Sequence, residues 1–580
     1  MRPLLFTTLW LSASAWAQSA AITSFLAAES PIAKANLLAN IGGSGSTKVA
    51  GVKTGVVVAS PSTSNPDYFY TWTRDSSLVF KTIIDQFTRG EDSSLRTVID
   101  AYLSSQIFQQ QVSNPSGTVS SGGLGEPKFN VDLSAFTGAW GRPQRDGPAL
   151  RATALITYGN WLIANSNTSF ALSTVWPVVK LDLDYVAANW NSTGFDLWEE
   201  VSSSSFFTTA VQHRSLREGA AFATKLGQTS VVVGYTTQAA NALCFLQSYW
   251  NPSAGYITAN TGGGRSGKDA NTALASIHTF DPAAGCDAGT FQPCSDKALS
   301  SLKVYVDAFR TIWSINSGVS SPNAVATGRY PEDSYYSGNP WYLTTLAVSE
   351  QLYDALIVWK AQGSLNVTST SLAFFQQFSP TVAIGTYAST TSIFTTLTVA
   401  IQDWADAFVA VVQKYTPANG ALSEQYDKNS GVPLSASDLT WSYAALLTTT
   451  ASRNSIVPDS WGAQGLAVPT SCSTSGGGGS GGGSGTVAVT FNVVATTVWG
   501  ENIYLTGSVD ALQNWSPDNA LLLSSSNYPT WSITVNLPAS SSIQYKYIRK
   551  FNGAVTWESD PNNSFTTPAS GSSTLSDTWR

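Results

Sequence analysis

Charged side chains are scarce in this sequence of 580 residues. Lys, Arg, Asp and Glu make up 12% of the chain, about half the usual fraction. The formal net charge is −7 and no cluster of Lys or Arg occurs, which argues against nucleic acid and anionic membranes as partners. The chain instead holds 20 Trp, 22 Tyr and 25 Phe, a balance that suits a neutral, hydroxylated ligand bound by ring stacking.

Metal-binding and phosphate-binding patterns are missing as well. The two histidines, His213 and His278, have no second His or Cys at ligand spacing, so we expect both to be structural and expect no metal site. Walker and G-x-S-x-G patterns do not occur. The glycine-rich run Gly262–Gly267 lacks the strand-to-helix context that a phosphate-binding loop requires.

The N-terminus has the three parts of a secretory signal. Arg2 supplies a positive start, Leu4 to Trp10 form an apolar run, and Ala15-Trp16-Ala17 is a cleavage site of the A-x-A type. We find no later run of about 20 apolar residues. The sequence therefore predicts a signal peptide over residues 1–17 and a secreted protein without a membrane span.

The cysteines and sequons fit export. Four cysteines allow three disulfide pairings, and the short loop from Cys286 to Cys294 favours a local bridge, which leaves Cys244 with Cys472. Sequons for N-glycosylation occur at Asn167, Asn191, Asn366, Asn514 and Asn562.

Two kinds of periodicity divide the chain. From about residue 20 to 470, apolar residues return at every third or fourth position, as in 78–87, 302–313 and 397–412. About a dozen such segments are too many for a simple bundle and suit stacked or ring-like helical pairs. The other predicted helices lie near 95–111, 147–164, 172–190, 206–226, 236–250, 341–361, 370–378 and 440–452.

A Gly/Ser-rich linker, residues 473–485, ends the helical region. Residues 486–580 hold short β-branched and aromatic runs separated by turns, which predict a small all-β sandwich. The loops between the predicted helices are long, as is typical of loops that carry function. They span roughly 59–75, 112–147, 190–205, 259–297, 326–341 and 416–441.

Acidic residues in two of these loops could carry chemistry. Asp196-Leu-Trp-Glu-Glu200 places two carboxylates beside an indole, where one carboxyl can act as a general acid and the ring can stack on a pyranose. The alternative is an exposed helix N-terminus. Glu424 is flanked by small and polar residues, so it should stay ionised and could serve as a base. Its alternative is a solvated loop carboxylate.

Other loops combine aromatics with arginine and carboxylates. Arg74 and Asp75 could grip vicinal hydroxyls of a sugar, or could pair with each other at a helix N-terminus. Trp140 stands among glycines, which favours a ring that projects as a ligand platform. The mixture recurs in Gly328–Asp333 with Tyr335 and Trp341, and in Ser423–Asp427 with Trp441.

The C-terminal segment has more large aromatics than a small core can bury. About two or three would fit inside such a sandwich, so the rest should be exposed stacking platforms. The aromatics are Trp499, Trp515, Tyr528, Trp531 and Trp557, with Lys546 and Asn562 as candidate hydroxyl partners.

These motifs, in this order, resemble known families. Residues from about 20 to 472 resemble the fungal glucoamylases, glycoside hydrolase family 15, and residues 486–580 resemble the family 20 starch-binding modules. The first resemblance rests on Asn65-Pro-Asp-Tyr68, Thr71–Asp75, Gly125–Phe129, Trp140–Pro148, Asp196–Glu200, Gly328–Asp333, Ser423–Tyr426 and Leu439–Tyr443. The second rests on Gly500–Tyr504, Tyr545-Lys-Tyr547 and Trp557–Asn562.

The resemblance implies an (α/α)6 barrel over residues 18–472 and an inverting exo-hydrolase that releases β-D-glucose from α-1,4 glucans, and more slowly from α-1,6 branches. Glu199 would be the general acid and Glu424 the general base, which together need no metal or organic cofactor. The expected partners are starch, maltooligosaccharides and other α-glucans, bound by a monomer. The implied sugar subsites are Tyr68, Arg74, Asp75, Trp140, Leu197, Trp198, Glu200, Arg329, Tyr335, Trp341 and Trp441.

The module would carry two starch sites. Trp515, Lys546, Trp557 and Asn562 would form the first, and Trp499, Tyr528 and Trp531 the second. The sequence departs from the family in two ways: its linker is short and glycine-rich rather than long and Ser/Thr-rich, and Asn562 lies in a sequon, where a glycan would block the site.

Three rival interpretations predict other features. An enzyme on the same barrel could act on dextran-type or trehalose linkages, but the starch-type module argues against it. A carbohydrate-binding protein with an inactive barrel would lack Glu199 or Glu424, and both are present. A structural wall protein would show low-complexity repeats outside the linker, and we find none.

Overall fold

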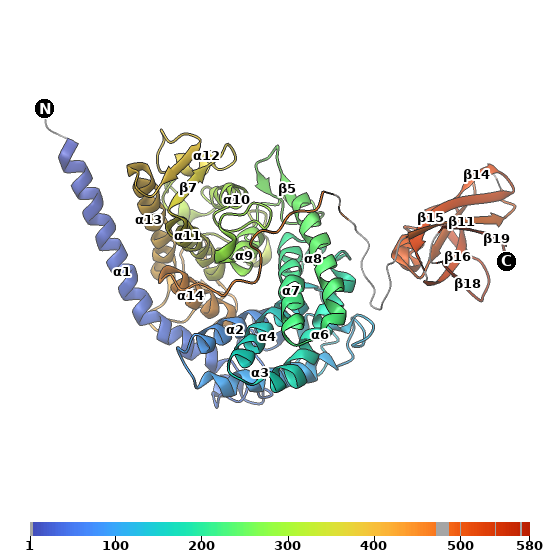
Figure 1. Cartoon of the computed structure of the whole chain (residues 1–580), viewed down its shortest axis with the longest axis horizontal. Helices are drawn as coiled ribbons and strands as arrows, with labels where there is room; N and C mark the ends of the chain where they lie inside the picture. The colour runs from blue at the N-terminus through green and yellow to red at the C-terminus, as the bar shows by residue number, and fades with distance from the viewer. Residues whose placement is uncertain (1–3, 471, 473–485, 499, 540, 569–570) are drawn as a thin grey trace. The chain divides into compact units, whose positions relative to one another are not determined.

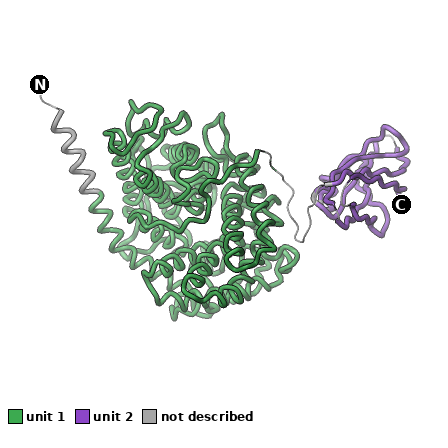
Figure 2. The backbone as a smooth tube through the Cα atoms, in the orientation of Figure 1, with its two compact units in different colours: residues 1–479 green, residues 480–580 purple. Residues whose placement is uncertain are grey.

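The computed structural model describes the backbone of residues 4–470, 472, 486–498, 500–539, 541–568 and 571–580, and the side chains from residue 19 onward within these ranges except 486, 510 and 514. The chain forms two compact units, residues 1–479 and 480–580 (Figure 2). The predicted linker, residues 473–485, lies outside the described residues, as do the side chains of the predicted signal peptide.

Within the described part of the first unit, six helices form a closed inner ring (Figure 1). Each packs against the next along the chain, and the last packs back against the first. In chain order they are α2 (Thr73–Thr88), α4 (Asp146–Ala164), α7 (Phe206–Lys225), α9 (Asn271–His278), α11 (Tyr342–Gln362) and α14 (Thr440–Arg453).

An outer helix packs against each inner helix. In the order of their inner partners from α2 to α14, the outer helices are α3 (Leu95–Gln110), α6 (Trp176–Asn189), α8 (Val232–Leu246), α10 (Asp296–Asp307), α13 (Ser392–Tyr415) and α1 (Leu4–Ala39). The unit is therefore an (α/α)6 barrel, as predicted. Two short helices, α5 (Thr168–Phe170) and α12 (Leu372–Gln376), lie outside this scheme.

The apolar stripes of the sequence become the packing faces. On α13, Leu397, Ile401, Phe408 and Val412 are all buried, as the periodicity predicts. Among the described helices, α13 alone is long and apolar enough to cross a membrane by composition. Because its apolar face packs against α11 and α1, those apolar residues are accounted for by the core of the barrel.

Helix α9 is the main departure from the predicted elements, because it falls inside the predicted loop 259–297. It spans only two turns, too few for a repeating apolar stripe. The predicted helix over 302–313 also ends early, at Asp307. Phe309 and Trp313 follow in a turn and are still buried, so the apolar residues were read correctly but the helix was placed six residues too far along the chain.

Short antiparallel strand pairs shape the loops of the barrel. The pairs are β1 (Thr71–Trp72) with β2 (Lys128–Phe129), β3 (Gly194–Phe195) with β4 (Ser202–Ser203), β5 (Trp250–Asn251) with β6 (Tyr256–Ile257), β7 (Ser364–Val367) with β8 (Gly385–Ala388), and β9 (Gln425–Tyr426) with β10 (Pro433–Leu434).

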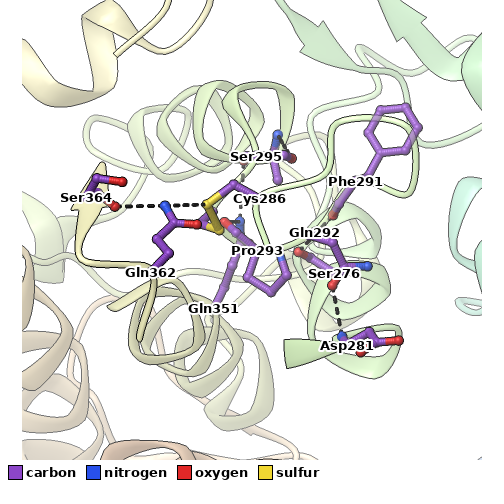
Figure 3. Close-up of a disulfide and its surroundings, with 12 residues drawn as sticks. Ser276, Asp281, Cys286, Phe291, Gln292, Pro293, Ser295, Gln351, Gln362 and Ser364 are labelled. Atoms are coloured by element: carbon purple, nitrogen blue, oxygen red, sulfur yellow. Dashed lines mark hydrogen bonds between the residues drawn. A yellow bond between two sulfur atoms is a disulfide. The ribbon is translucent and has the colours of Figure 1, made fainter. Parts of the chain in front are cut away.

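Both predicted disulfides are confirmed. Cys244 on α8 is bonded to Cys472, and Cys286 to Cys294 in the loop after α9. Figure 3 shows the amide of Gln362 between the second disulfide and Ser364, whose carbonyl accepts its hydrogen bond at 2.7 Å.

The second unit is the predicted β-sandwich. One sheet has the order β14-β15-β11-β19 and the other β13-β12-β16-β17, with β18 also paired to β16. Phe491, Trp531, Tyr545 and Tyr547 belong to the core between them. The strands are β11 (Thr486–Val494), β12 (Asn502–Gly507), β13 (Leu521–Leu522), β14 (Ser524–Asn527), β15 (Thr530–Pro538), β16 (Ser542–Phe551), β17 (Ala554–Trp557), β18 (Asn563–Thr566) and β19 (Ser572–Thr578).

Candidate active site

The N-terminal ends of the inner helices carry the predicted site residues. Arg74 and Asp75 lie in the first turn of α2, Trp341 directly precedes α11, and Trp441 lies in the first turn of α14. Glu199 precedes α7 at the end of the β3–β4 loop. Because a helix N-terminus carries a partial positive charge, a ring of such ends stabilises carboxylates placed near it.

A pocket lies at this end of the ring. Trp140, Glu200 and Tyr335 are the predicted catalytic-domain residues that are not part of its wall. Ala59, Trp72 and Leu439 line it without having been singled out. The predicted residues that line the pocket are Tyr68, Arg74, Asp75, Leu197, Trp198, Glu199, Arg329, Trp341, Glu424 and Trp441.

The loop that carries Glu199 is held by a buried carboxylate. Asp196 accepts hydrogen bonds from the backbone N–H groups of Glu200 and Val201, at 3.0 and 3.1 Å. Glu199 has a positive φ of 68°, a strained conformation for a residue other than glycine. A Cβ on Gly141 would lie 2.5 Å from the Glu199 carbonyl oxygen, so only glycine fits beside it. The alternative of an exposed helix N-terminus for this stretch is therefore wrong.

Three donors converge on one oxygen of Glu199. Its Oε1 accepts from Trp72 Nε1 at 2.6 Å, from Gln144 Nε2 at 3.1 Å and from Arg74 Nη2 at 3.4 Å. Arg74 also bonds to Gln144 and Asp146, at 2.7 and 3.1 Å, which fixes its guanidinium. The carboxyl group is thus oriented from two separate segments, one holding Trp72 and Arg74 and the other Gln144.

Glu200 is instead a fixed anion. Its Oε1 lies 2.9 Å from Arg329 Nη2 and its Oε2 lies 2.5 Å from Arg265 Nη2, and Tyr330 donates to it as well. Burial acts to raise the pKa of Glu200, but these partners outweigh it and hold the pKa below its ordinary value. Glu200 is therefore poorly suited to donating a proton.

Glu424 lies in an environment that the sequence did not indicate. It is 1% exposed, so the alternative of a solvated carboxylate is wrong, and burial raises its pKa to about 7, above the value expected for the ionised carboxylate that the sequence predicts. The hydroxyl of Ser435 and the amide of Gln425 both donate to Oε2, the latter at 3.0 Å. These donors, with the Tyr68 hydroxyl, act to lower the pKa and favour the ionised form.

Indole rings form one wall of the pocket. Trp198 and Trp341 meet edge to face at 5.7 Å, with the Arg329 guanidinium 5.6 and 5.3 Å from their centroids. Trp198 Nε1 donates to Asp269 at 2.8 Å, which fixes the ring. Burial raises the pKa of Asp269 to about 7 and that of Asp75, at the start of α2, to about 6.

Trp140 and Tyr335 lie next to the pocket wall. Trp140 packs against Trp72 at 5.8 Å, with Lys128 Nζ 3.5 Å from its centroid. Tyr335 shares a hydrogen bond of 2.9 Å with Tyr68. Both residues therefore contact side chains that line the pocket.

The aromatics of the second unit divide into exposed and buried groups. Tyr528 is 51% exposed and Trp557 39% exposed. Trp531 is 3% exposed and donates to the Ala495 carbonyl from the core, so its ring offers little free surface for stacking on a sugar. Trp499 lies outside the described residues.

The remaining predicted module residues differ in exposure. Trp515 is half-buried and Asn562 is exposed, with the Asn562 amide 3.1 Å from Gln544. Lys546 is largely buried, and its Nζ lies 2.6 Å from Asp560. Its ammonium group thus already has a carboxylate partner.

Comparison with known proteins places both units. Residues 31–451 match the glycosyl hydrolases family 15, and residues 486–577 match the starch binding domain. The chain belongs to glycosyl hydrolase family 15.

Relatives of this family match over nearly the whole chain. The chain is 66% identical to Glucoamylase-1 of Schizophyllum commune, covering 99% of this chain and 98% of that protein. It is 52% identical to Glucoamylase of Neurospora crassa, with 96% and 94% covered. The solved Glycoside Hydrolase Family 15 Glucoamylase from Hypocrea jecorina matches with a TM-score of 0.78 and 50% identity, over 96% of this chain and 100% of that one.

In this family 15 barrel, several site residues carried no signal of their own. Trp72 and Gln144 lie inside motifs in which other residues were predicted to bind the ligand. Both donate hydrogen bonds to Glu199. Ser435 is a short polar residue and Asp269 a single acidic residue, and both lie in long loops. Only the fold brings Ser435 to Glu424 and Asp269 to Trp198.

The histidines lie away from the pocket. His213 is buried with Nδ1 2.9 Å from the Ala239 carbonyl, and His278 lies at the end of α9.

Proposed function

We propose that the chain is a secreted, exo-acting glucan 1,4-α-glucosidase that releases β-D-glucose from the non-reducing ends of starch, with slower action on α-1,6 bonds. The carrying observation is that Glu199 and Glu424, from loops before different inner helices, line one small pocket. In the proposed exo action, the non-reducing end of a glucan chain enters this pocket. The family 15 match and the named relatives support the substrate class.

Glu199 is the proposed general acid. The three donors act on Oε1, so we assign Oε2 as the oxygen that carries the proton to the glycosidic oxygen. Glu200 cannot take this role, because Arg329 and Arg265 hold it as a carboxylate. Its charge instead keeps the guanidinium of Arg329 in place beside the indole wall.

Glu424 is the proposed general base. Ser435 and Gln425 hold Oε2, which leaves Oε1 to activate the attacking water. Positive charge that develops on the sugar ring would lower the pKa of Glu424 and favour its ionised form during the reaction. Inversion requires the two carboxyl groups to lie roughly 6.5–9.5 Å apart, which leaves room for that water.

The pocket wall supplies the proposed sugar contacts. Arg74, Asp75 and Arg329 offer charged groups to sugar hydroxyls, while Tyr68, Leu197, Trp198, Trp341 and Trp441 offer apolar and aromatic surfaces. Trp140, Glu200 and Tyr335 would act at the rim or through the residues that they hold.

The second unit is proposed to tether the enzyme to starch granules, which raises the local concentration of chain ends. Trp557 and Tyr528 are exposed enough to stack on sugar rings. Trp515, Lys546 and Asn562 complete the proposed contacts of the first starch site.

The test is an NMR time course of maltoheptaose digestion that follows the anomeric proton of the first sugar released. We expect β-glucose to appear before mutarotation produces the α anomer. Initial release of α-glucose would exclude the inverting assignment, and initial release of longer oligosaccharides would exclude exo action.

A further inference from the structure

A second and larger hollow lies inside the helical ring, toward the C-terminal ends of α2, α9 and α14. Its space is about 1200 Å³, and it is lined by residues of all six inner helices. None of the carboxylates proposed for catalysis contributes to its wall. The hollow is therefore separate from the proposed active site.

Most charges on the wall of this hollow are already paired. Each lysine or arginine there lies next to a carboxylate of its own. The pairs are Lys81 with Asp85 at 2.6 Å, Arg89 with Glu91 at 2.7 Å, and Arg214 with Glu218 at 3.2 Å. These pairs leave the hollow with no spare positive charge among the described residues that line it.

Two carboxylates lack such a partner. Glu350 and Asp354 lie four residues apart on α11, on the same face of the helix, and are 7% and 2% exposed. Glu350 accepts from the hydroxyls of Thr448 and Thr449 at 2.6 and 3.2 Å. Asp354 Oδ1 is buried and has no hydrogen-bond partner within the described chain.

Burying two neighbouring carboxylates without a countercharge is costly, and a cation would remove much of that cost. Burial raises the pKa of Glu350 to about 7, and burial together with the neighbouring Glu350 raises the pKa of Asp354. The nearby C-terminal ends of α2 and α9 add partial negative charge. The local field therefore favours a positive ligand.

We propose that Glu350 and Asp354 bind a hydrated divalent cation of the calcium class, which links α11 to α14. The hydroxyls of Thr448 and Ser452 lie on the same wall and are hard oxygen ligands that suit such an ion. Calcium takes six to eight oxygen ligands with flexible geometry, and the hollow has room for the waters that would complete its shell.

The ligand set selects against transition metals. Among the described residues, no group of three or more His, Cys, Asp or Glu is placed to hold one ion, so this site supplies only two carboxylates and its other ligands would be hydroxyl and water oxygens. Zinc and its neighbours prefer imidazole or thiolate ligands, which this wall does not supply at the two carboxylates.

The experiment is calcium titration of the chelator-treated full-length protein, by isothermal calorimetry and by thermal unfolding at about pH 7.5, where both carboxylates can ionise once a cation is present. We expect saturable binding and a Tm increase of about 3 °C at saturation. Sodium chloride at matched ionic strength should not reproduce it.

Variants decide whether the named carboxylates are responsible. Asp354→Asn or Glu350→Gln should abolish both the heat of binding and the Tm increase, while Glu91→Gln, which alters a paired carboxylate of the same hollow, should keep them. Having two isosteric variants guards against one that does not fold. Equal calcium responses in all variants, no binding to the unaltered chain, or an equal response to a primary ammonium ion would each overturn the proposal.

Discussion

Glu199 and Glu200 are adjacent in the sequence, yet the structure gives them different chemistry. Glu199 is oriented by neutral indole and amide donors and by one arginine, whereas Glu200 lies between two arginines and a tyrosine. The backbone turn at Glu199 separates the two side chains. Position in the loop therefore decides which charged and neutral partners each carboxyl meets.

Replacing the proposed acid tests this distinction. Glu199→Gln should lower kcat by about 10²–10⁴ while the Kd for a maltooligosaccharide changes little, because the amide keeps the shape but carries no proton. Steady-state kinetics and calorimetric binding measure the two quantities. Retention of most of the turnover would remove Glu199 from the role of acid.

The hydroxyl of Ser435 should tune the base. It donates to Glu424, so Ser435→Ala should raise the Glu424 pKa and move the acidic limb of the kcat/KM profile to higher pH by about 0.5–1 unit. Ser430→Ala is the matched control, because that hydroxyl bonds to Asp427 in the same loop. An unmoved or lowered acidic limb in Ser435→Ala would contradict this role.

The two proposed catalytic residues were predicted from the sequence, but their surroundings were not. The motif around Asp196–Glu200 is local, so its carboxylates could be read directly. The burial of Glu424 could not, because it depends on Ser435, Tyr68 and Tyr335, which come from three separate loops. Contacts across such sequence distances leave no local pattern.

At the scale of elements, strand β15 and strand β17 present their tryptophans to opposite environments. Trp531 on β15 is enclosed by the sandwich core, and Trp557 on β17 is partly open. Successive side chains of a strand point to opposite faces of the sheet, so the sequence shows which residues share a face. It does not show which of the two faces the other sheet covers. The resemblance to the starch-binding modules assigned both rings to starch sites.

The two tryptophans should therefore give opposite results on truncation. Trp557→Ala should weaken adsorption to starch granules and leave turnover of soluble maltooligosaccharides unchanged. Trp531→Ala should lower the free energy of unfolding of the second unit by about 3–5 kcal/mol. Granule-binding isotherms and denaturant unfolding measure these effects, and an exchange of the two outcomes would reverse the assignment.

The helical ring itself was predictable from periodicity, except for α9. Long amphipathic helices such as α13 repeat their apolar residues over several turns. Helix α9 has only eight residues, and Asp269 supports its start by accepting the backbone N–H of Asn271. Its place in the ring is imposed by packing against α7 and α11 rather than by its own pattern.

At the scale of the whole molecule, buried carboxyls make stability depend on pH. A carboxyl with a raised folded pKa keeps its proton in the folded state, so its stabilising effect is full below the unfolded value and is lost as pH rises to the folded value. The two histidines oppose this effect below about pH 6.5, because burial lowers the folded pKa of His213 to about 4 and that of His278 to about 3. Burial raises the pKa to about 7 for Glu350, Asp269 and Glu424, and to about 6 for Asp75.

The chelator-treated protein should accordingly be more stable at about pH 5 than at about pH 7.5, with a Tm higher by about 3–5 °C, because the carboxyls outnumber the histidines. Differential scanning calorimetry at constant ionic strength measures the difference. A Tm that rises toward pH 7.5 would show that the buried carboxyls are ionised in the folded protein.

The bond between Cys244 and Cys472 also has a mechanical consequence. It anchors the last described residue before the second unit to the outer helix α8, 228 residues earlier in the chain. A pull from a granule-bound module would enter the barrel through this covalent anchor. The load would enter at α8, which packs against α7, rather than through the segment that follows α14.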